Sequence, residues 1–60
     1  MNEQEAYVYG DIVKFCDDEG QTQIGKVTNV DQINQFIHVE NEDGAVFGVR
    51  FRNAKRIFGD

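Results

Sequence analysis

The sequence predicts one small all-β domain in which five short strands roll into a barrel, with a 3₁₀ turn before the last strand. Two observations predict this fold. Valine, isoleucine, phenylalanine and tyrosine dominate the apolar residues, and no stretch keeps a helical period, which favours strands. Glycine- and acid-rich turns separate the apolar runs at short intervals. We expect residues 1–5 to be a disordered tail and residues 6–60 to form the single domain.

The first two strands are expected at residues 11–16 and 23–30. In the first, Val13 and Phe15 share one face, and Cys16 is expected to be a small packing residue. In the second, the apolar residues recur every three positions rather than every two, at Ile24, Val27 and Val30. A bulge or bend near Gly25 would account for that spacing.

The last three strands have clearer boundaries. Residues 36–41 and 45–52 alternate apolar and polar positions, and the turn between them ends in an Asp-Gly pair that is typical of hairpins. A 3₁₀ turn at residues 53–55 and a short strand at residues 56–58 complete the chain. Closing these strands into a barrel would remove free sheet edges, and a four- or five-stranded meander is the alternative.

The alternation also divides the apolar residues into a core and a remainder. The expected core residues are Val13, Phe15, Val27, Ile37, Val39, Phe47, Val49, Phe51 and Ile57. The apolar residues left over are Tyr7, Tyr9, Phe36, Val46 and Phe58. A domain of this size cannot bury them all, and an exposed apolar patch is typical of a binding site or an oligomer contact.

Two segments carry a family resemblance. Gly-Asp-Ile-Val-Lys-Phe at residues 10–15, a glycine at position 20 and Gly-Lys-Val-Thr-Asn-Val at residues 25–30 resemble the KOW-type opening of SH3-like barrels. Residues 49–57 resemble the strand, 3₁₀ turn and last strand of such barrels. The resemblance implies an SH3-like barrel. It does not carry over RNA binding, because residues 17–19 are acidic where the nucleic-acid-binding members of the group carry lysine or arginine.

Two other functions are known for such barrels, and the sequence is compatible with only one of them. Signalling SH3 domains read proline-rich ligands with a tryptophan, which this chain lacks, so that function is not expected. Tudor-like domains enclose methylated side chains in an aromatic cage. The residues available for such a cage here are Tyr7, Tyr9, Phe36 and Phe58.

Composition limits the possible functions further. No apolar run is long enough to span a bilayer and the start lacks a secretion signal, so we expect a cytoplasmic protein that binds no membrane. A single cysteine forms no internal disulfide, and with a single histidine it completes no zinc site, so no metal or other cofactor is expected. The net charge of −5 disfavours nucleic acid as a partner.

Few residues are candidates for chemistry. Cys16 and His38 form a nominal nucleophile and base, but no third group is present to orient them, and the acids next to Cys16 disfavour a thiolate. Neither acidic cluster has the spacing of a calcium loop. We therefore expect no enzyme activity and no small-molecule substrate.

The remaining candidate is a partner-binding surface. Four of the six basic residues lie close together near the C-terminus, and alternation places aromatic residues beside them. The expected surface comprises Phe36, His38, Val46, Arg50, Arg52, Lys55, Arg56 and Phe58. The sequence thus predicts a module that binds another protein or a second copy of itself. Weak binding of RNA or single-stranded DNA by the basic residues is the alternative, and a third interpretation is that these bases only balance nearby acids.

Overall fold

The computed structural model describes residues 7–58, so the predicted disordered tail at residues 1–5 lies outside the described residues. Five strands follow one another as β1 (Ile12–Cys16), β2 (Thr22–Asp31), β3 (Phe36–Asn41), β4 (Val46–Arg50) and β5 (Ala54–Phe58). A 3₁₀ turn, Phe51–Asn53, joins β4 to β5. The prediction of five strands in an all-β fold is confirmed. The predicted 3₁₀ turn begins earlier in the chain than expected, which shortens β4 and lengthens β5.

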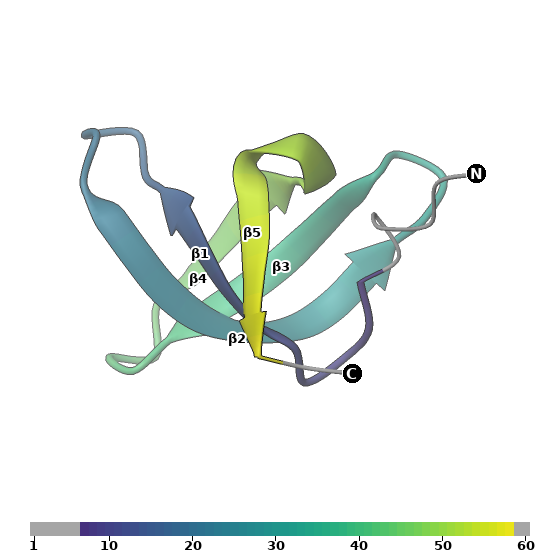
Figure 1. Ribbon diagram of the computed structural model, residues 1–60, viewed down its shortest axis with the longest axis horizontal. Coiled ribbons are helices and arrows are strands. Elements are labelled where there is room, and N and C mark those ends of the chain that lie inside the picture. The colour runs from purple at the N-terminus through teal and green to yellow at the C-terminus, as the bar shows by residue number, and fades with distance from the viewer. Residues whose placement is uncertain (1–6, 59–60) are drawn as a thin grey trace.

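All five strands form one antiparallel sheet with the order β4-β3-β2-β1-β5. The sheet is strongly curved, and β2 is the long bent strand that spans it in Figure 1. The hydrogen-bonded ladder does not close, because β4 pairs only with β3, and β5 only with β1, in the described part of the chain. The predicted closure into a barrel is therefore not observed among residues 7–58, where β4 and β5 are both edge strands.

The bulge predicted in β2 exists, but at a different place. The register between β2 and β3 shifts between Val27 and Asn29, so that Thr28 is the extra residue. An extra residue restores Val27 and Val30 to the same face, which explains their spacing. Gly25 has another role, because a Cβ at this position would lie 2.5 Å from the Glu40 carbonyl oxygen. The glycine is needed for close approach of two strands rather than for a bend.

The core lies on the inner face of this curved sheet. Of the side chains described, at residues 7–57, eight apolar ones are buried there: Tyr7, Val13, Phe15, Val27, Ile37, Val39, Val49 and Phe51. Most of the predicted core is confirmed, with two exceptions. Phe47 is only partly buried, and Ile57 is 41% exposed because it is the extra residue where the register between β1 and β5 shifts. Tyr7, which was expected among the surplus aromatics, belongs to the core instead.

Candidate functional site: a groove beside β4

Alternation brings four of the predicted surface residues onto one outer face. Phe36 pairs with Arg50, and His38 pairs with Gly48, in the ladder between β3 and β4. Val46 lies on the same face, and its side chain is 60% exposed. The geometry predicted for Phe36, His38, Val46 and Arg50 is thus present in the structure.

A glycine gives this face its shape. A Cβ at Gly48 would lie 2.7 Å from Cζ of Phe36, so the ring occupies the space that a side chain would fill. The Phe36 ring also meets His38 edge to face, with 5.4 Å between the ring centroids. Nδ1 of His38 lies 3.3 Å from the Asn29 side-chain amide. The result is a half-buried aromatic platform beside β4.

A groove of about 640 Å³ runs from this platform around the free edge of β4. One wall is β4 along its whole length. The opposite wall is the end of β1 and the turn after it. The groove is lined by Phe15, Cys16, Asp17, Asp18, Glu19, Phe36, Val46, Phe47, Gly48, Val49, Arg50 and Asn53. Three of the predicted partner-binding residues therefore line one groove.

Asp17 fixes the acidic wall of the groove through the hydrogen bonds that its carboxylate accepts. Its Oδ1 accepts hydrogen bonds from the backbone N–H groups of Glu19 and Gln21, at 3.0 and 2.9 Å. Its Oδ2 accepts one from the Gln23 side-chain amide at 2.9 Å. The Gln23 amide, followed by the backbone N–H of Gln21, lowers the pKa of the Asp17 carboxyl below its ordinary value. Asp17 thus stays ionised and fixes a turn whose other carboxylates, on Asp18 and Glu19, face solvent.

The predicted basic cluster does not form a single patch. Arg50 lines the groove, and Arg52 lies exposed in the 3₁₀ turn. Lys55 on β5 is paired with Lys14 of β1 in the ladder. Arg56 forms an ion pair with a buried aspartate, Asp11. The side chain of Phe58, another predicted surface residue, lies outside the part of the chain that the structure describes. Only Arg50 of these basic residues adjoins the aromatic platform.

The contacts of Arg56 form a structural cluster that the sequence did not reveal. Nε and Nη2 of Arg56 each lie 2.9 Å from Oδ2 of Asp11, which is 2% exposed. The guanidinium lies over the Tyr7 ring, 5.2 Å from its centroid. The Tyr7 hydroxyl donates to the Ala54 carbonyl oxygen at 2.8 Å. Because Tyr7 is buried in these contacts, it is not part of an open aromatic cage of the Tudor type.

Cys16 also differs from its prediction. It was expected to pack in or near the core, but it is exposed and lines the groove. It points to the outer face because it follows the inward-facing Phe15 by one residue. No group of histidine, cysteine, aspartate and glutamate side chains within residues 7–58 is arranged to hold a metal ion.

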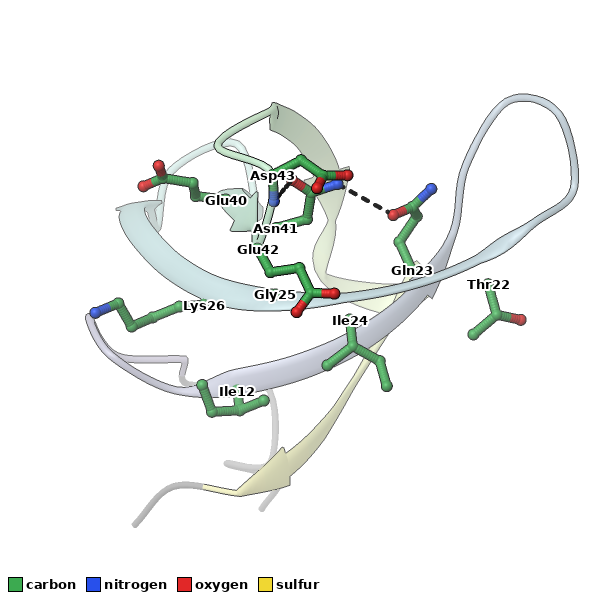
Figure 2. A pocket seen from close by; sticks show the side chains of 10 residues that line it. All are labelled: Ile12, Thr22, Gln23, Ile24, Gly25, Lys26, Glu40, Asn41, Glu42 and Asp43. Atoms are coloured by element: carbon green, nitrogen blue, oxygen red, sulfur yellow. Dashed lines mark hydrogen bonds between the residues drawn. The ribbon is translucent and has the colours of Figure 1, made fainter.

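A second groove crosses the outer face of β2 (Figure 2). Ile12 and Ile24, from neighbouring strands, are among its lining residues, and Figure 2 shows the Asn41 amide reaching toward Gln23. That amide donates to Oε1 of Gln23 at 3.3 Å, so Gln23 links the two hairpin turns. The groove is lined by side chains of both charges, such as Lys26 and Glu42. It contains no free strand edge, and none of the residues predicted to bind a partner lines it.

Comparison with known proteins finds no matching family model and no curated protein similar in sequence. Within residues 7–58, the structure contains no helix with the length and apolar character needed to cross a membrane.

Proposed function

We propose that this chain is a non-enzymatic docking module that binds another protein through the groove beside β4. The observation that carries the proposal is the joining of an exposed apolar residue, Val46, an aromatic platform, Phe36, and an exposed cation, Arg50, in one groove. Aromatic residues and arginine are enriched at protein interfaces, and an apolar centre with a charged rim is the usual arrangement.

The SH3-like fold belongs to this proposal rather than to the observed architecture. The strand order, the curvature and the 3₁₀ turn before the last strand support it, although the sheet is open. A cytoplasmic location also belongs here. It suits an exposed single thiol, because cytosolic reductants keep such thiols free.

The proposal is tested by capture from a lysate of the cell that encodes the chain. Proteins retained by the native chain should be lost from an Arg50→Ser/Val46→Ser variant, since both side chains are exposed and their replacement removes the cation and the apolar contact while leaving the core intact. Lys26→Ala is the matched control, because it removes an exposed charge from the other groove. A protein retained equally by all three chains would contradict docking at β4.

The same preparations test the nucleic-acid alternative. Bound RNA that is released steeply by added salt, and that is absent from an Arg50→Ala/Arg52→Ala variant, would replace the proposal with binding through phosphate contacts. Absence of bound RNA at low salt is the result we expect.

A further inference from the structure

Within residues 7–58, one side of the β4 backbone is unpaired. Asn41 donates to the Ala45 carbonyl oxygen, and Phe51 donates to the Gln35 carbonyl oxygen, each at 2.9 Å. Both bonds lie in the register that pairs β3 with β4. Residues along an antiparallel pair alternate between bonded and non-bonded positions. Phe47 and Val49 therefore direct their backbone groups to β3. The backbone groups that point to the free edge belong to Val46, Gly48 and Arg50.

This edge carries few of the features that protect sheet edges from pairing. The chain contains no proline, and the register between β3 and β4 is regular over all five pairs, so no bulge twists the edge away. No lysine lies in β4, and its central residue is a glycine. The groove exposes this edge along the full length of the strand. An added strand would find both unpaired backbone groups and apolar contacts there.

The charge of the groove indicates what kind of peptide strand would bind beside β4. Asp18 and Glu19 are exposed on the opposite wall, and neither carboxylate forms an ion pair within residues 7–58. Asp17, the third acid of that wall, is fixed as an anion by its hydrogen bonds. A strand lying between this wall and β4 gains from a lysine or arginine. A second copy of the chain is less suited, because each copy carries a net charge of −5.

We propose that β4 accepts an extended peptide segment of a partner protein as a sixth strand, and that a lysine or arginine of this segment faces the Asp17–Asp18–Glu19 wall. The inference rests on the proposed docking function and specifies the partner's chemistry. Main-chain hydrogen bonds to Val46, Gly48 and Arg50 supply the affinity, and the acidic wall supplies the selectivity.

The test begins with selection of random displayed peptides on the native chain. The selected peptides should be rich in lysine or arginine and in β-branched residues. In their presence, the amides of Val46, Gly48 and Arg50 should exchange more slowly with solvent, while those of Phe47 and Val49 stay unchanged. Bound peptide should also slow alkylation of Cys16, the one cysteine of the chain, because Cys16 lines the groove.

Two variants of one residue separate strand addition from side-chain docking. Val46→Pro removes an edge N–H and should weaken peptide binding about tenfold, whereas Val46→Ala keeps that N–H and should change binding much less. Slow exchange at Phe47 and Val49 confirms that each variant is folded. Equal weakening by both variants would overturn strand addition and leave the docking function standing.

Other outcomes would contradict the proposed partner chemistry or the docking function itself. Selection that yields no peptides, or peptides rich in acids, would contradict the proposed partner. Peptides whose binding protects no β4 amide and is unaffected by Arg50→Ser/Val46→Ser would contradict the docking function as well. A dimer in sedimentation whose Val46, Gly48 and Arg50 amides are protected without peptide would assign the edge to a second copy.

Discussion

The two edge strands of the sheet differ in how their side chains are used. Along β5, Arg56 is bound to the buried Asp11, and Ala54 accepts a hydrogen bond from Tyr7. Along β4, Val46 and Arg50 face solvent beside a groove. The chain therefore stabilises itself at one edge and leaves the side chains of the other edge available for binding. Residues of the binding surface on β4 can then be substituted without unfolding the domain, because the stabilising contacts lie at β5.

Substitution of one arginine at each edge should reveal the largest difference in stability between the two edges. Arg56→Ala leaves the buried Asp11 carboxylate without its cation and should lower the free energy of unfolding by about 3 kcal/mol. Arg50→Ala removes an exposed side chain and should change the free energy of unfolding by about 0.5 kcal/mol or less. Urea denaturation followed by circular dichroism measures both. Similar losses for the two variants would contradict the division between a stabilising and a binding edge.

Two glycines sharpen the same contrast between the middle of the sheet and its open edge. In Gly25→Ala, the new Cβ meets the Glu40 backbone, which cannot move without distorting the ladder. The expected loss is about 2–3 kcal/mol. In Gly48→Ala, the Cβ meets only the end of the Phe36 ring, which can turn toward solvent, so the loss should be about 1 kcal/mol. The melting temperatures of the two variants should fall in that order, and the reverse order would contradict the account.

The smallest effect is expected at the acidic wall and depends on pH. The pKa of Asp17 is lowered from 3.8 in the folded protein, so its ionised form stabilises the fold above that pH. This contribution disappears as the pH falls through the lowered pKa. The native chain should therefore exceed Asp17→Asn in stability near neutral pH, and the difference should shrink in acid. Asp31, whose pKa is lowered through Asn34, leaves some acid dependence in both chains.

Urea midpoints measured across the acid range test this prediction. Asp18→Asn is the control, since it removes one charge from the same turn without touching the hydrogen bonds of Asp17. Its midpoint near neutral pH should stay close to the native value. Identical pH profiles for the native and Asp17→Asn chains would exclude a role for the Asp17 carboxylate in fixing the turn.

Local pattern was enough to predict the strands and one face of the site. Period-two alternation placed Ile37 and Val39 inside, and it placed Phe36 and Arg50 together outside. The bulge in β2 was expected in kind but at the wrong residue, because its position depends on the partner strand rather than on β2 itself.

Contacts between residues far apart in the chain could not be predicted from the sequence. Asp11 and Arg56 are separated by 45 positions, and only the register between β1 and β5 brings them together. Tyr7 is buried by the same contacts. The groove arises where the turn after β1 faces β4, and no local pattern encodes that juxtaposition. The exposure of Cys16 follows from the same arrangement.

Amide hydrogen exchange in the free protein reports whether the outer side of β4 is unpaired. We expect fast exchange for Val46, Gly48 and Arg50, and slow exchange for Phe47 and Val49, which donate to β3. Uniformly slow exchange along β4 in the monomer would show that the edge is already paired and would contradict the account.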